Sequence, residues 1–128
     1  MSELLRESLL VGVGGFFGAV GRFLMTIWVN AHTDTFPYGT LAVNVLGCLL
    51  IGAILGWAST RENVSETSRL FLVTGILGSL TTFSTFGHET VDLFRQGATG
   101  PAVGNIAMNV VVGLVAVTLG LAMSRGLG

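Results

Sequence analysis

The sequence predicts an all-α membrane protein with four transmembrane helices, and three observations carry this prediction. Charged residues make up 10% of the 128 residues, whereas a soluble domain of this size carries roughly 25%. Hydrophobic residues make up 51%, and the mean hydropathy is +0.78. The charged positions also divide the chain into four apolar stretches, each able to hold the roughly 20 helical residues that cross a bilayer. A chain of this length forms at most one domain, so we expect a single transmembrane domain over residues 1–128.

The four spans are placed by the charges and breakers that bound them, at residues 9–29, 39–59, 69–94 and 101–123. The first contains one charge, Arg22, and its apolar character runs past the roughly 7–15 residues of a signal peptide without a convincing cleavage site. Pro37 and Pro101 suit the first turns of the second and fourth helices, because a missing N–H costs little there. Ser65 offers an N-cap oxygen to the third helix.

The third span contains an unusual cluster of glycines and hydroxyl residues. Gly75 and Gly78 precede Thr81, Thr82, Ser84 and Thr85, a poor sequence for a continuous helix. We expect a break at mid-membrane depth, where Ser and Thr side chains satisfy the freed backbone groups. Half-helix ends at such a break can hold a cation with their carbonyls or an anion with their N–H groups. A continuous helix whose hydroxyls bond back to its own carbonyls is the alternative.

Two faces follow from helical spacing after the break. Phe83 and Phe86 lie three residues apart on one face, and Thr82, Thr85 and Glu89 form a polar stripe on a neighbouring face. A pair of phenylalanines is ordinarily packing. Beside a polar stripe in a membrane, however, the electropositive ring edges could hold a small anion without a full positive charge.

Several more polar residues lie at membrane depth. Asn44 falls in the second span, and Asn105 and Asn109 share one face of the fourth. An unpaired amide is costly in hydrocarbon, so each should face protein or a water-filled path, and a role as interhelical glue remains equally open. Arg22 is a functional candidate, because ionisable residues inside a membrane usually serve function.

Glycines at helical spacing favour close helix packing. Gly14–Gly18 and Gly52–Gly56 form GxxxG pairs, and in lipid such small residues let backbones approach. They could pack helices within one chain or form a homodimer interface. Four helices rarely enclose a polar pathway alone, so we expect an oligomer.

The arginines barely specify orientation. With four spans, both termini and the middle loop share one side of the membrane. Four arginines fall on that side and two on or near the other: Arg6, Arg61, Arg69 and Arg125 against Arg22 and Arg95. This bias is weak. A protein inserted both ways, forming an antiparallel dimer, would show it, and so would any chain with few arginines.

Other function classes lack support. The chain has no lysine and its arginines are scattered, which argues against nucleic acid as a partner. His88 and Glu89 resemble the start of a zinc-protease motif, but the second histidine is missing. We find no set of nucleophile, base and orienting residue and expect no enzyme. Cys48 lies in an apolar run, where packing is its ordinary role.

Three segments together resemble the Fluc (CrcB) family of small bacterial fluoride channels. They are Gly21-Arg22, the sequence GTLAVN at 39–44, and the sequence TTFSTF at 81–86 that follows Thr74-Gly75. The likeness extends over the whole chain in length and number of spans. It implies an antiparallel, dual-topology homodimer with two pores that exports fluoride passively across the bacterial inner membrane and confers fluoride resistance.

The resemblance also implies roles for individual residues. Phe83 and Phe86 would form an aromatic box whose edges coordinate fluoride, and Asn44 would donate its amide to the ion. The polar side of the pathway would be formed by Ser84, Thr85 and Glu89.

A structural sodium ion is implied at the dimer centre, held by backbone carbonyls, here those of Gly78 and Thr81. Arg22 would lie near a wide vestibule. Position 79 is Ser where the family commonly has a second glycine, which leaves the backbone less free. Asn109 falls where the family can carry a hydroxyl and is the weakest of these assignments.

Two rival functions remain. A small dual-topology, proton-coupled multidrug exporter requires a membrane-embedded carboxylate, usually in the first helix, whereas the deepest acid here is Glu89. A purely structural subunit would not need polar residues at several depths. The physical chemistry favours the channel, because a strongly hydrated anion needs compensating hydrogen-bond donors spaced so that it can also leave.

Overall fold

The computed structural model describes residues 2–31, 35–61 and 64–125, and every regular element in these ranges is helical. The helices are α1 (Glu3–Asn30), α2 (Tyr38–Ser59), α3 (Glu66–Arg69), η1 (Leu70–Leu77), α4 (Gly78–Leu80), α5 (Phe83–Arg95), α6 (Thr99–Ala107), η2 (Met108–Val112) and α7 (Gly113–Arg125). The segments η1 and η2 are π-helical. Four stretches are long and apolar enough to cross a membrane, namely Glu3–Asn30, Tyr38–Ser59, Glu66–Arg95 and Thr99–Ser124. The prediction of an all-helical chain with four spans is confirmed.

Polar side chains fix where the helices start. The Ser65 hydroxyl accepts a hydrogen bond from the Ser68 amide at 3.2 Å, so the predicted N-cap is confirmed. Pro37 directly precedes α2, and Pro101 is the third residue of α6. The first helix begins at Glu3, earlier than residue 9, because the Ser2 hydroxyl caps a polar first turn. Apolar character therefore marks the membrane crossing but not the start of the helix.

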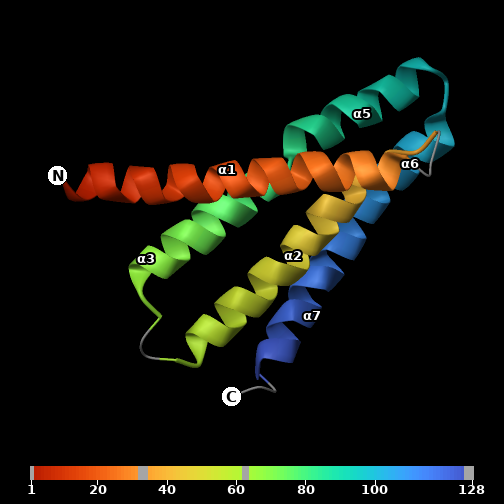
Figure 1. Cartoon of the computed structure of the whole chain (residues 1–128). Helices are drawn as coiled ribbons and strands as arrows, with labels where there is room; N and C mark the ends of the chain where they lie inside the picture. The colour runs from red at the N-terminus through yellow and green to blue at the C-terminus, as the bar shows by residue number, and fades with distance from the viewer. Residues whose placement is uncertain (1, 32–34, 62–63, 126–128) are drawn as a thin grey trace.

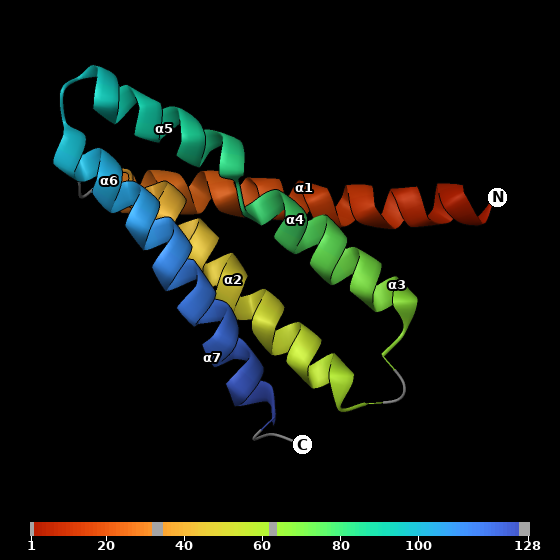
Figure 2. The same ribbon diagram turned by 180° about the vertical axis from the view of Figure 1, so that it is seen from behind.

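The helices pack in two pairs, α2 with α7 and α1 with the first half of the third span, and α1 also contacts α2 (Figures 1 and 2). Helix α2 runs alongside α7, while α1 crosses the bundle and packs on η1 and α4. The N-terminal part of α1 extends away from the other helices in both views. At its other end, the Asn30 side-chain oxygen accepts a hydrogen bond from the Gly39 amide at 2.9 Å, which ties the end of α1 to the start of α2.

Glycines make both close contacts possible. A Cβ at Gly18 would lie 2.1 Å from the Ile76 carbonyl oxygen, and one at Gly14 would lie 2.6 Å from that of Phe71. Between α2 and α7, a Cβ at Gly52 would overlap the Val117 carbonyl oxygen, and one at Gly56 would overlap the Ser124 hydroxyl. All four glycines of the GxxxG pairs therefore pack helices within the chain, which is one of the two roles that the sequence left open.

Two extended residues separate α4 from α5. Thr81 has φ −81° and ψ 155°, and Thr82 has φ −150° and ψ 115°. The glycines upstream remain helical: Gly75 is buried, with its Cα against Gly14, and Gly78 begins α4. Within the glycine and hydroxyl stretch, the backbone therefore departs from helix at the threonines and not at these two glycines. The absence of a side chain at Gly75 allows close packing on Gly14. The extended segment consists of two threonines instead.

Packing at Gly18 can be tested against Gly12, where a Cβ would meet nothing within 4 Å. We expect Gly18→Ala to lower the free energy of unfolding by about 1–3 kcal/mol, because a methyl group would overlap backbone atoms that cannot move aside. Gly12→Ala should leave stability unchanged or slightly raised. Thermal unfolding in detergent measures both, and equal melting temperatures would contradict the proposed contact.

Candidate functional site

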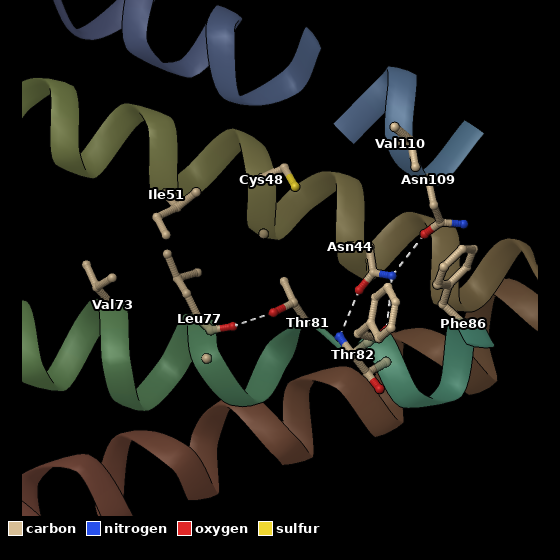
Figure 3. Close-up of a pocket in the computed structure, with 13 residues that line it drawn as sticks. Asn44, Cys48, Ile51, Val73, Leu77, Thr81, Thr82, Phe86, Asn109 and Val110 are labelled. Carbon is tan, nitrogen blue, oxygen red and sulfur yellow. Dashed lines mark hydrogen bonds between the residues drawn. The ribbon is translucent and has the colours of Figure 1, made fainter. Parts of the chain in front are cut away.

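An open cleft of about 380 Å³ lies between α2 and the third membrane span, with η2 at one end (Figure 3). It runs along η1 and α4, past the extended residues, to the first turn of α5. Its polar lining residues are Asn44, Thr81, Thr82 and Asn109, and its aromatic lining residues are Phe83 and Phe86. The structure thus brings together residues from three spans that the sequence singled out separately.

The Asn44 side chain supplies the hydrogen bonds that the extended backbone lacks. Its Oδ1 accepts from the Thr82 amide at 2.8 Å, and its Nδ2 donates to the Thr82 carbonyl at 3.2 Å. One side-chain amide therefore pairs with both backbone groups of one residue, as a neighbouring strand would. The partner comes from α2, as Figure 3 shows, so the extended segment is fixed to a different helix.

The two phenylalanines lie on the first turn of α5. The Thr82 hydroxyl caps this helix by accepting from the Thr85 amide at 3.2 Å. The ring centroids of Phe83 and Phe86 are 5.5 Å apart with planes tilted by 57°. Phe83 is 82% exposed, so most of this side chain is uncovered by the rest of the chain.

Three hydroxyl groups cluster beside these rings. The Thr82 hydroxyl donates to that of Thr85 at 3.0 Å and lies 3.4 Å from that of Ser84. Because Thr85 accepts in this contact, its own hydroxyl proton remains free for another acceptor. Ser84 and Thr85 are both exposed.

Glu89 lies outside the cleft. The Thr40 hydroxyl, 1% exposed, donates to its Oε1 at 2.7 Å. The other carboxylate oxygen is buried, with no hydrogen-bond partner in the described part of the chain. Glu89 faces a separate polar cavity of about 500 Å³ that it shares with Asn30, Asp92 and Gln96. The sequence placed Glu89 on a stripe with Thr82 and Thr85 but gave no sign of its partner Thr40, because that contact joins two spans.

The asparagines of the fourth span are linked to Asn44. The Asn44 Nδ2 donates to the Asn109 Oδ1 at 2.9 Å, and the Asn109 Nδ2 donates to the Asn105 carbonyl and Oδ1, each at 3.0 Å. Asn105 in turn donates to the Thr90 hydroxyl at 3.0 Å. Sequence reasoning missed Thr90, although its place four residues after Phe86, on the same side of α5, was a signal.

The carbonyls assigned to a cation lie at the extended segment. In a continuous helix the Thr82 amide would donate to the Gly78 carbonyl and the Thr85 amide to that of Thr81. Here the first donates to Asn44 and the second to the Thr82 hydroxyl. The oxygens of Gly78 and Thr81 are thereby released from their helical donors, and both residues line the cleft. A hard cation prefers such oxygen ligands, so this donor set fits one.

Other metal ligands and charges are not gathered at the cleft. Within the described residues, no group of three His, Cys, Asp or Glu side chains could hold a metal ion. Arg22 is half-buried on α1 and is not among the residues that line the cleft. The lining is therefore uncharged.

Within the described ranges, four helices long and apolar enough to cross a membrane, three of which line an uncharged cleft, define a multi-pass membrane protein. Residues 9–121 match the family model described as "CrcB-like protein, Camphor Resistance (CrcB)", and the chain belongs to this family. The resemblance stated from the sequence is thereby confirmed.

Three relatives carry the name fluoride-specific ion channel FluC. The one from Agrobacterium fabrum is 45% identical over 92% of this chain and 95% of its own length. The one from Chloroflexus aurantiacus is 45% identical over 97% and 99%, and the one from Clostridium perfringens is 42% identical over 98% of each.

The bond between Thr40 and Glu89 yields a stability prediction. We expect Thr40→Val to lower the free energy of unfolding by about 1–3 kcal/mol, because it leaves both oxygens of a half-buried carboxylate without a donor. The matched control is Thr118→Val, since that exposed hydroxyl bonds only to the Leu114 carbonyl of its own helix. Thermal unfolding of the two variants side by side tests the difference, and an unchanged melting temperature for Thr40→Val would contradict it.

Proposed function

We propose that this chain is a fluoride-selective ion channel that carries fluoride passively out of the cell and thereby confers fluoride resistance. One observation carries the proposal: the exposed Phe83 ring and the Asn44 amide line one uncharged cleft, and the exposed hydroxyls of Ser84 and Thr85 follow on the same turn of α5. The name shared by the relatives, across nearly their whole length, supports the same conclusion.

The chemistry of the cleft suits a small, strongly hydrated anion. Hydrogen-bond donors and ring edges compensate for the water that fluoride leaves behind. The Asn44 amide already gives its hydrogens to Thr82 and Asn109, so a passing ion replaces one of these acceptors. Ser84 and Thr85 add hydroxyl donors, and Glu89 lies further along the polar side. Because no arginine lines the cleft, the ion is held weakly enough to leave.

The pathway is completed by a second copy of the chain. The cleft of one copy is open, and the Phe83 ring is largely uncovered. We propose an antiparallel, dual-topology homodimer in the bacterial inner membrane with one pore per copy, two in all. The weak bias of the arginines, four on one side against two on or near the other, is compatible with insertion in both orientations. In this arrangement Arg22 lies towards the wider, aqueous end of each pore.

A sodium ion at the centre of the dimer would be held by the carbonyls of Gly78 and Thr81. The ion would supply positive charge to carbonyls that have lost their helical donors. At a dimer axis the same carbonyls from both copies would meet, so the ion would also join the two chains.

The rival function as a proton-coupled multidrug exporter is not favoured. The acids of α1 are Glu3 and Glu7, both near its N-terminal end, whereas such an exporter needs a carboxylate deep in that helix. Glu89 is engaged by Thr40, and the relatives are named as channels.

Fluoride efflux from liposomes tests the function. We expect protein-containing vesicles to release fluoride rapidly and chloride at the rate of empty vesicles. Phe83→Ile should slow fluoride efflux by about tenfold, the factor that corresponds to about 1.4 kcal/mol, which is within the range for one aromatic contact. Phe17→Ile is the matched control, because Phe17 belongs to a phenylalanine pair on α1 that does not line the cleft.

Two outcomes would contradict the proposal. Equal fluoride efflux from empty and protein-containing vesicles would remove the channel function. If Phe83→Ile and Phe17→Ile slow fluoride efflux equally, the cleft has no specific role in fluoride conduction.

Dual topology can be measured with a single cysteine. In a Cys48→Ala background, Gln96→Cys places a thiol on the exposed segment between α5 and α6. If the protein inserts in both orientations, a membrane-impermeant thiol reagent should label about half of the protein in intact cells and all of it after permeabilisation. Complete labelling or none in intact cells would establish a single orientation instead.

A further inference from the structure

Asn105 is completely buried on α6 and does not line the cleft, yet it is hydrogen-bonded on both sides. Its Nδ2 donates to the Thr90 hydroxyl, and its Oδ1 and backbone carbonyl accept from the Asn109 Nδ2. A buried amide in a membrane helix needs such partners. Their arrangement also determines which end of each side-chain amide donates and which end accepts.

This assignment begins at Thr90. Its hydroxyl proton is committed to the Phe86 carbonyl at 2.7 Å, so towards Asn105 the hydroxyl acts as an acceptor. Asn105 must therefore turn its nitrogen to Thr90, which leaves its oxygen facing Asn109.

The same logic continues through the next two amides. The Asn109 Nδ2 donates to two oxygen atoms of Asn105, so the Asn109 side chain turns its Oδ1 towards Asn44. The Asn44 nitrogen faces that oxygen, and the Asn44 oxygen faces the Thr82 amide. Reversing any one amide would bring two donors or two acceptors together, which is costly in a low dielectric.

The chain of bonds connects the extended segment to the first turn of α5. Its two ends are the Thr82 amide and the Phe86 carbonyl, and Phe83 lies between these residues. We propose that Asn105 is a positioning residue of the channel, which sets the orientation of Asn109 and through it holds Asn44 on Thr82. The inference rests on the proposed function only where its test uses fluoride efflux.

A purely structural role is the competing explanation, in which Asn105 only holds α6 to α5 through Thr90. A double-mutant cycle separates the two. Asn105→Leu, similar in size but without hydrogen-bonding groups, should slow fluoride efflux by about threefold to tenfold, the factor expected for one buried hydrogen bond. Added to Asn109→Leu, it should cause no further loss. If it slows efflux equally in both backgrounds, Asn105 does not act through Asn109 and the proposal falls.

A second measurement does not depend on transport. Hydrogen exchange of the Thr82 amide, followed by NMR in a membrane mimetic, reports the bond to Asn44 directly. Asn105→Leu should speed this exchange by about threefold to tenfold, whereas Thr118→Val should leave it unchanged. If Asn105→Leu does not fold, Thr90→Val replaces it, because that change removes the acceptor that orients Asn105.

The outcomes distinguish the two levels of the proposal. If Thr82 exchange responds to Asn105 but the wild-type protein conducts no fluoride, positioning by Asn105 stands and the channel function fails. If the wild-type protein conducts and a folded variant alters neither efflux nor Thr82 exchange, positioning by Asn105 is overturned.

Discussion

Thr82 is extended within a membrane-crossing segment, where its N–H and carbonyl lack helical partners, and the Asn44 amide bonds to both groups. Without this pair, two backbone groups inside the span would have no hydrogen-bond partner from the protein, which is tolerated only where a cavity supplies one. The features of the cleft follow from it. The helix restarts with Phe83 as its first residue, the Thr82 hydroxyl is free to cap that restart, and the Gly78 carbonyl is left without its helical donor.

Packing elsewhere keeps this pair in place. The contact of α1 with η1 brings backbone to within reach of backbone at Gly14 and Gly18, which fixes the first half of the third span. The contact of α2 with α7 does the same for the span that carries Asn44. Because lipid offers no hydrophobic drive between helices, close van der Waals contact supplies the attraction. Polar contacts add specific links between spans, such as those from Asn44 to Thr82 and from Thr40 to Glu89.

Much of the fold and part of the site could be predicted from the sequence. The spacing of charges predicted the four spans, Ser65 predicted a cap, and helical spacing placed Phe83 and Phe86 on one face. The partners across spans could not be predicted. The bonds from Asn44 to Thr82 and from Thr40 to Glu89 depend on how two helices are rotated against each other, which the repeat within one helix does not specify. For the same reason, Asn105 was visible only as a buried amide in need of a partner.

The order of Asn44 and Thr82 along the chain has a consequence for the synthesis of the protein. Chains emerge and begin to fold from the N-terminus, so Asn44 is synthesised before the third span and Asn109 and Asn105 after it. An extended segment entering the membrane can thus meet its partner at once, since α2 precedes it in the chain. The amides of the fourth span are synthesised last, after both Asn44 and Thr82. The extended segment, which is the part of the chain least suited to a membrane, is therefore synthesised only after Asn44, the residue that provides its hydrogen bonds.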